Sequence, residues 1–177
     1  CASAGGAPAV LLEAHRVSMA FGAFKAVDDA NVGVAEGEIV GLIGPNGAGK
    51  STFFNCLTGD LTPTSGRISF AGQDVTRLPP EGRAALGIAR SFQVPLTFGG
   101  MTVLDNVMIG AFLRTPHTHE ARERARAVIE RVGLARLADA PARSLGTPGR
   151  KRLEIARALA TDPQVLLLDE AMAGLTP

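Results

Sequence analysis

The sequence predicts an α/β protein with a mostly parallel sheet. Along the chain, short apolar runs that suit strands alternate with segments whose apolar residues recur at helical spacing. A glycine-rich loop at residues 44–49 joins an apolar run to a helical pattern, and the apolar run Val165–Leu168 ends in two carboxylates, Asp169 and Glu170. Strands that alternate with helices in this way are typical of a parallel sheet covered by helices.

Composition favours a globular protein with one ordinary-sized core. The chain has 177 residues, of which 46% are hydrophobic and 20% are charged, and these values exclude a disordered class. The formal net charge of +1 argues against nucleic-acid binding through bulk charge. No apolar run approaches the ~20 residues that a membrane span needs. Cys1 and Cys56 form no disulfide framework and predict reduced thiols of a cytosolic compartment.

The first half of the chain predicts strands around a loop. Residues 1–9 are small and flexible and suit a linker or scar; they show no signal peptide, and a first residue other than Met indicates a processed start or a piece of a longer chain. Strands are expected at 10–21 and near 30–34. The apolar run 38–43 predicts a buried strand before the glycine-rich loop. A helix over 50–58, a strand that leads into a turn over 66–72, and a short helix opening at 79–81 follow.

The second half is mainly helical. Residues 95–149 predict a small helical insertion, in which Thr102 caps one helix and a second helix covers 120–132. Gly133 ends that second helix. A third helix is expected at 150–160, and a buried strand at 165–168 precedes the acidic pair.

The loop matches the pattern G-x-x-x-x-G-K-[ST], which predicts a phosphate-binding site. It comprises Gly44, Pro45, Asn46, Gly47, Ala48, Gly49, Lys50 and Ser51. Its glycines let backbone N–H groups turn toward phosphate oxygens, and the following helix N-terminus adds partial positive charge. Lys50 would bind the β- and γ-phosphates, and the Ser51 hydroxyl would bind Mg²⁺. The alternative is a glycine-rich turn that ends in Lys-Ser by chance.

The acidic pair predicts a metal ligand and a base. The carboxyl ends of parallel strands face the ligand crevice, so Asp169 is expected to hold Mg²⁺, directly or through water. Glu170 beside it is placed to activate a water molecule against the γ-phosphate. The alternative is two solvated carboxylates at the end of a strand.

With these motifs in place, the chain resembles the ATP-binding cassette (ABC) ATPases. The resemblance lies in residues 44–52, 90–93, 152–159 and 167–170, in the order that the family has them. It implies a P-loop NTPase (RecA-like) core with a mostly parallel sheet, an N-terminal antiparallel β subdomain and an inserted helical subdomain. The implied division is core with antiparallel subdomain at 10–94, helical subdomain at 95–149, and signature helix, Walker B strand and D-loop at 150–177. ATP and Mg²⁺ are the implied cofactors.

The resemblance also implies roles for individual residues. Phe21 would stack on adenine, Gln93 would sense Mg²⁺ and the attacking water, and residues 145–149 would form the signature that contacts ATP on a second subunit. Phe21 as a core residue and Gln93 as a surface amide remain alternatives. The expected site is therefore catalytic Lys50, Gln93 and Glu170; nucleotide-binding Phe21, Gly44, Pro45, Asn46, Gly47, Ala48, Gly49, Lys50, Ser51, Thr52, Leu145 and Gly149; and metal-binding Ser51, Gln93 and Asp169.

Some positions depart from the family pattern. The signature segment lacks the family's serine and glutamine, and Pro148 has no N–H for a phosphate. Ala171 stands where the family has proline. The family continues beyond position 177 with a strand and a histidine that contacts the γ-phosphate. We therefore expect weak or no ATPase activity from these residues alone.

Three sequence segments resemble one branch of the ABC ATPase family in particular. Residues 37–43, 101–107 and 173–177 resemble the ATPase subunits of branched-chain amino-acid importers. This likeness implies an ATP-hydrolysing motor that works as a homodimer or with a second ABC subunit, bound to membrane permease subunits at the cytoplasmic face of the inner or plasma membrane, with no nucleic-acid partner. A non-transport ABC ATPase and a regulatory nucleotide-binding module with a degenerate signature are the alternatives.

Overall fold

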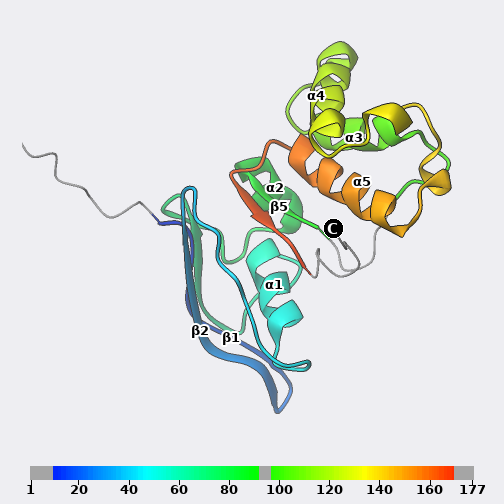
Figure 1. Ribbon diagram of the computed structural model, residues 1–177. Helices are drawn as coiled ribbons and strands as arrows, with labels where there is room; N and C mark the ends of the chain where they lie inside the picture. Colours follow the sequence, from blue (N-terminus) through cyan, green and yellow to red (C-terminus); the bar gives the residue numbers. More distant parts are fainter. Residues whose placement is uncertain (1–9, 92–96, 170–177) are drawn as a thin grey trace, which may run out of the picture. The chain divides into compact units, whose positions relative to one another are not determined.

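The computed structural model describes residues 10–91 and 97–169, which form two compact units divided between Arg83 and Ala84. Figure 1 labels the helices and strands of both. The first unit contains an antiparallel sheet and the helix that follows the glycine-rich loop. The second contains a cluster of helices and a pair of parallel strands.

The sheet of the first unit has the strand order β2-β1-β3-β4, with every neighbouring pair antiparallel. Its strands are β1 (Val10–Phe21), β2 (Phe24–Ala35), β3 (Ser65–Phe70) and β4 (Gln73–Asp74). Leu12, Ala14 and Ile68 are buried on one face, as expected for a sheet that has one covered side. The predicted antiparallel subdomain is present, and β2 begins well before the predicted residue 30.

The turn between β3 and β4 shows how local sequence sets this hairpin. Ala71 and Gly72 both have positive φ, +48° and +78°. A two-residue loop with positive φ at both positions matches the right-handed twist of the flanking strands. The predicted turn at Gly72 is therefore confirmed, together with the strand before it.

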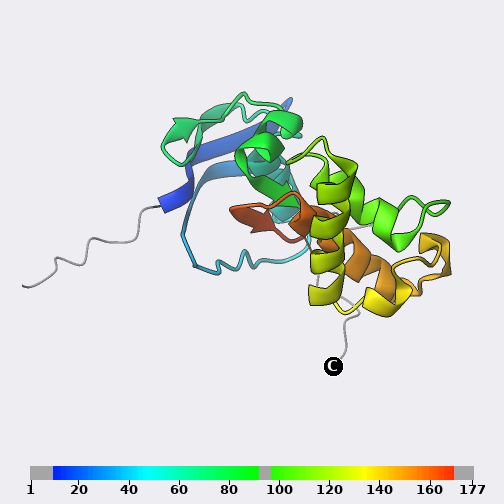
Figure 2. The same cartoon turned by 90° about the horizontal axis from the view of Figure 1, so that it is seen from above.

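The segment 38–43 corrects a prediction. We expected a buried strand, but the structure assigns no strand to these residues, and the side chains of Ile39 and Ile43 are 98% and 94% exposed. Figure 2 shows the chain between β2 and α1 as a long loop. An apolar run only makes a strand possible; burial also needs neighbouring strands and a covering layer. Within its own unit, the described part of the chain pairs no strand with this run.

Helix α1 (Lys50–Thr58) begins directly after the loop, as predicted. Phe53 and Leu57 are buried, and Gly59 ends the helix with φ +87°. α2 (Pro80–Leu86) begins at a proline, where the missing N–H costs no helical hydrogen bond. From α2, the Arg83 guanidinium reaches the end of α1 and donates to the carbonyl oxygens of Cys56 and Leu57 at 2.6 and 2.7 Å.

The second unit contains the parallel strands β5 (Ile88–Arg90) and β6 (Val165–Leu167), which pair from Ile88↔Val165 to Arg90↔Leu167. The sequence pattern predicts β6 but gives no signal for β5, which is only three residues long. Within the described residues, these two strands are the parallel part of the fold. Their carboxyl ends lie side by side, because the register is parallel.

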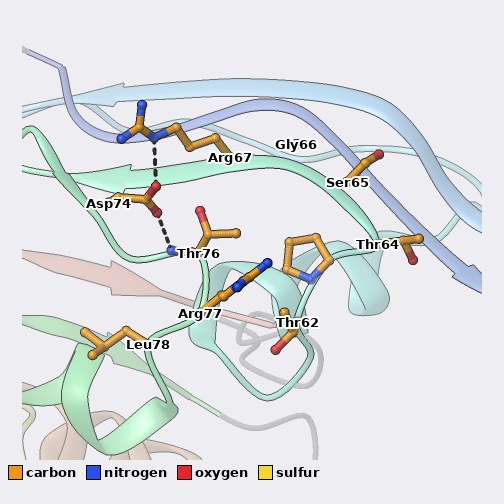
Figure 3. Close-up of a pocket in the computed structure, with 10 residues that line it drawn as sticks. Thr62, Thr64, Ser65, Gly66, Arg67, Asp74, Thr76, Arg77 and Leu78 are labelled. Atoms are coloured by element: carbon orange, nitrogen blue, oxygen red, sulfur yellow. Dashed lines mark hydrogen bonds and ion pairs between the residues drawn. The ribbon is translucent and has the colours of Figure 1, made fainter.

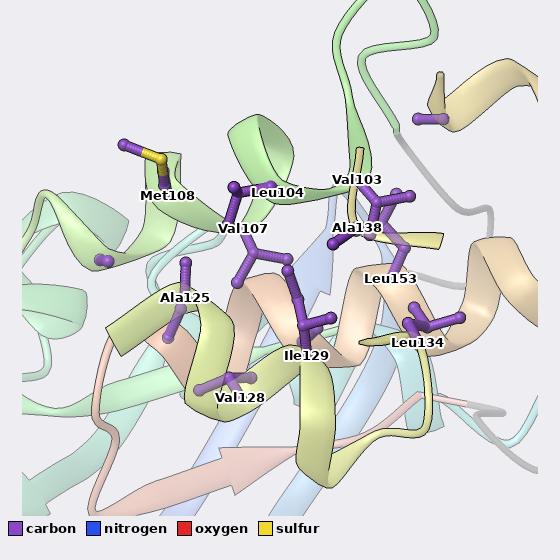
Figure 4. Packing of buried hydrophobic residues seen from close by; sticks show 14 of the residues in the cluster. Val103, Leu104, Val107, Met108, Ala125, Val128, Ile129, Leu134, Ala138 and Leu153 are labelled. Atoms are coloured by element: carbon purple, nitrogen blue, oxygen red, sulfur yellow. The ribbon is translucent and has the colours of Figure 1, made fainter. Parts of the chain in front are cut away.

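Three helices form the main core of this unit (Figure 4): α3 (Val103–Ala111), α4 (Thr118–Arg131) and α5 (Thr147–Ala160). The short 3₁₀ turns Ala135–Leu137 and Ala142–Ser144 connect α4 to α5. Leu104, Ile129 and Leu153 are at most 2% exposed. Thr102 caps α3 as predicted, because its Oγ1 accepts a hydrogen bond from the Asp105 N–H at 3.0 Å. Phe112, just beyond the end of this helix, is 44% exposed.

Asn106 fixes the turn that leads into α3. Its side chain is fully buried; Oδ1 accepts from the Phe98 N–H at 2.9 Å, and Nδ2 donates to the carbonyls of Phe98 and Thr102. These bonds satisfy a buried amide that would otherwise be costly.

Among the helices that the structure describes, none combines the length and the apolar character that a membrane crossing requires.

Candidate functional site

The glycine-rich loop has a backbone that its glycines make possible. Gly47 and Gly49 have φ of +83° and +82°, the left-handed region that glycine enters at little cost. A Cβ at Gly49 would also overlap the carbonyl oxygen of Ala26 in β2. Gly49 is therefore required twice, for its φ and for the close approach of β2 to the loop.

Lys50 folds back over this loop. Its Nζ donates to the carbonyl oxygens of Gly44 and Pro45 at 2.7 and 2.8 Å. The ammonium is therefore held above the loop by groups that carry only partial negative charge. Phosphate oxygens, which carry full charge, would make stronger hydrogen bonds with it.

The start of α1 offers backbone donors to an anion. No side chain caps this helix end, and no acidic residue lies in its first turn. The first N–H groups of a helix lack helical acceptors and carry the positive end of the helix dipole. Ser51 is exposed in the same turn. Loop, ammonium, amides and hydroxyl thus come together in one short segment, as the sequence predicted.

Asp169 in the second unit lies two residues past β6 and contacts a residue that sequence reasoning missed. Its Oδ2 is 3.6 Å from Nη2 of Arg90, at the end of β5, and the two side chains are only 13% and 12% exposed. Ser91, next to Arg90, donates its backbone N–H to the Leu167 carbonyl at 2.9 Å. The signal was the parallel pairing of two strands that both end in charged residues, and it was hidden because β5 was not predicted.

Other predicted residues have mixed outcomes. Phe21 at the end of β1 is 50% exposed, which excludes the alternative that it is a core residue. The Leu145 side chain is buried in the helical core. Gly149 lies in the first turn of α5. Gln93 and Glu170 fall outside the described residues.

Three basic residues, Arg150, Lys151 and Arg152, lie near the start of α5. Hydrogen bonds within the protein account for the position of the first of them. Arg150 donates from Nε to the Leu145 carbonyl at 2.9 Å and from Nη2 to the Arg143 carbonyl at 3.4 Å. These carbonyls offset the unfavourable position of a cation near a helix N-terminus. A bound anion is therefore not needed to account for Arg150.

A pocket of about 890 Å³ in the first unit lies away from the predicted residues. Figure 3 shows that Arg67 and Thr76 converge on the Asp74 carboxylate there. Hydrogen bonds from Thr76 and the nearby Arg67 guanidinium, 2.9 Å from Asp74 Oδ2, lower the pKa of Asp74. Asp74 is thus paired with Arg67, and Arg77, which also lines the pocket, adds a further positive charge.

Comparisons with known proteins agree with the geometry of the loop. A family model described as "ABC transporter" matches residues 27–173. The chain is 42% identical over 182 aligned residues to the high-affinity branched-chain amino acid transport ATP-binding protein LivG of Escherichia coli K12, with 94% of this chain and 71% of LivG covered. It is 38% identical to the corresponding BraF protein of Pseudomonas aeruginosa, with the same coverage.

Solved structures show the same fold. MJ1267, an ATP-binding cassette of an ABC transporter, is 35% identical and gives a TM-score of 0.87 over 96% of this chain and 72% of its own. The ADP conformation of MJ1267 gives 0.84. MJ0796, a bacterial ABC transporter cassette with a dimeric structure, is 25% identical and also gives 0.84, over 94% of this chain and 76% of its own. These likenesses confirm the predicted cassette fold.

Proposed function

Because the chain belongs to the ABC transporter family, we propose that it is the ATP-binding and ATP-hydrolysing motor of an importer for branched-chain or related amino acids. The substrate class is supported by LivG and BraF, which are described as branched-chain amino acid transport ATP-binding proteins. The nucleotide is supported by the loop. The observation that carries the proposal is the Lys50 ammonium held by carbonyl oxygens of a loop that also contains two left-handed glycines, Gly47 and Gly49.

The loop suits a triphosphate for three reasons. Gly47 leaves open space for oxygens close to the backbone, the first N–H groups of α1 are donors without a side-chain cap, and Lys50 supplies a full positive charge. On binding, Lys50 exchanges its two loop carbonyls for phosphate oxygens. Gly44, Pro45, Asn46, Ala48 and Thr52 complete the segment that surrounds them.

The residues that would hold Mg²⁺ offer hard oxygen donors, which this ion prefers. Ser51 presents a hydroxyl, and Asp169 presents a carboxylate with a cationic neighbour. Mg²⁺, when bound, neutralises charge on the phosphates. We assign Gln93 to sensing the metal and the attacking water, and Glu170 to accepting that water's proton.

Phe21 is proposed as the adenine platform. The ring is half exposed at the end of β1 and lies next to the turn that leads to the exposed Phe24. Exposed aromatic rings at a hairpin end are available for stacking on a flat base.

The assembly is proposed from the relatives. A dimer, formed with a second copy or with another ABC subunit, would bring residues 145–149 to the nucleotide of its partner, and MJ0796 shows that a cassette of this fold forms a dimer. Membrane permease subunits would bind the dimer at the cytoplasmic face of the membrane.

Isolation from membranes tests the transport role. Affinity-tagged full-length protein is expected to bring down a permease with several membrane-spanning segments.

A second experiment tests hydrolysis. Glu170→Gln is expected to retain ATP and to shift the protein to a stable dimer, because loss of the base stops hydrolysis after binding. Lys50→Ala is the control that weakens nucleotide binding itself. Capture of ribosomes in place of a permease, or an unchanged oligomeric state in Glu170→Gln with ATP, would contradict the proposal.

A further inference from the structure

Arg90 and Asp169 form an ion pair at the carboxyl ends of the two parallel strands. The pairing of Arg90 with Leu167 fixes how far β5 extends along β6, and the hydrogen bond from the Ser91 N–H to the Leu167 carbonyl continues the pairing by one residue. Asp169 follows β6 by two residues. The backbone therefore delivers both side chains to the same edge of the sheet.

The geometry of the pair is that of a charge partner rather than a tight hydrogen bond. Nη2 of Arg90 and Oδ2 of Asp169 are 3.6 Å apart, longer than the 2.7–2.9 Å of a charge-assisted hydrogen bond. Both side chains are nearly nine-tenths buried. A carboxylate this far from water needs a positive charge nearby, and the attraction between the two groups is only weakly screened by solvent.

The neighbouring Ser91 supports a polar centre at this edge. Its Oγ is buried, with 2% of the residue exposed, and finds no hydrogen-bond partner among the residues that the structure describes. Buried hydroxyls are normally paired, and a water molecule, an ion or a catalytic role is among the explanations for an exception.

We propose that Arg90 is a positioning residue that serves as the counter-ion of Asp169 and limits how strongly this carboxylate attracts Mg²⁺. The inference rests on the proposed function, in which Asp169 binds the metal. A guanidinium beside the carboxylate repels an incoming divalent cation, so Asp169 alone retains the metal poorly. The metal would then be held only when nucleotide phosphates add further ligands.

The test compares nucleotide binding with and without the metal in the full-length protein. The dissociation constant of a fluorescent ATP analogue is measured in EDTA and again in excess Mg²⁺. The value in EDTA divided by the value in Mg²⁺ is a ratio that reports the contribution of the metal. Arg90→Gln is expected to enlarge this ratio by about fivefold or more, because the repelling charge is gone. Arg90→Lys, which keeps the charge, should stay within about twofold of the wild type. Arg124→Gln, which removes an exposed arginine of α4, is the matched control.

A double variant shows whether the effect passes through Asp169. Asp169→Asn should reduce the ratio toward one, and adding Arg90→Gln to it should change nothing further. An unchanged ratio in Arg90→Gln, or a reduced one, would overturn the inference. Misfolding of Arg90→Gln that Asp169→Asn does not rescue would do the same, since it assigns Arg90 a purely structural role; rescue would support the charge pairing. Failure of the wild type to bind the analogue in either buffer would instead refute the proposed function.

Discussion

At the scale of single residues, Gly49 links the first sheet to the candidate site. Its φ of +82° and the closeness of its Cα to the Ala26 carbonyl together exclude any side chain. The sequence indicated a glycine requirement from the motif alone. The contact with β2 was not predictable, because it depends on a strand that is distant in sequence.

Gly49→Ala should therefore destabilise the protein by about 1–3 kcal/mol, through backbone strain and displacement of Ala26. Urea unfolding followed by circular dichroism gives the change in the free energy of unfolding. Gly41→Ala is the matched control, because a Cβ there meets nothing within 4 Å and the backbone is not left-handed. Equal stability of the two variants would show that the loop adapts and that the close contact is unimportant.

The sequence predicts the surroundings of Lys50 better than those of Asp169. Motif spacing predicted the role of Lys50, and the structure shows its ammonium on the expected loop. The partner of Asp169 was missed because Arg90 lies 79 positions earlier, on a strand too short to show periodicity. Long-range pairing of this kind is decided by tertiary packing rather than by local pattern.

At the scale of elements, Arg83 stabilises the end of α1. This buried side chain, 1% exposed, donates to the carbonyls of Cys56 and Leu57 in α1 and to those of Thr76 and Leu78. The last carbonyls of a helix lack helical donors and form the negative end of its dipole. Burial lowers the pKa of Arg83, and these four acceptors offset the cost of burying its charge. α1, which begins where the phosphate loop ends, is thus fixed at its far end.

Replacing this arginine by a residue of similar volume tests the role. Arg83→Met is expected to lower the free energy of unfolding by about 3 kcal/mol or more, because buried carbonyls lose their donors. Chemical denaturation of the variant, compared with Arg77→Met at an exposed neighbouring position, measures the difference. Similar midpoints for the two variants would mean that water or backbone rearrangement satisfies the α1 carbonyls.

Other elements show where local signals are sufficient and where they fail. Thr102 and the apolar spacing after it predicted α3 correctly, because caps and helical periodicity act within a few residues. The same kind of apolar signal at 38–43 led to a wrong strand, with Ile39 and Ile43 almost fully exposed. A strand in a sheet depends on neighbours, which the local pattern does not contain.

At the scale of the whole molecule, sequence predicted the cassette fold and the helical subdomain. Most of the buried apolar residues of α3, α4 and α5 form one cluster. The extent of β2 and the existence of β5 were not predicted, because strand ends are set by pairing with distant segments. Family likeness supplied the nucleotide and the importer class, which composition and periodicity do not contain.

The central claim is that the loop at residues 44–51 binds the phosphates of a nucleotide through Lys50. Titration of full-length protein with ATP and Mg²⁺, followed by calorimetry, tests it most directly. We predict a dissociation constant below about 1 mM for the wild type and for the control Arg124→Ala. For Lys50→Ala we predict affinity about tenfold weaker or worse, because a charged hydrogen-bond donor to phosphate is lost. Equal binding by the wild type and Lys50→Ala, or no binding by the wild type, would contradict the account.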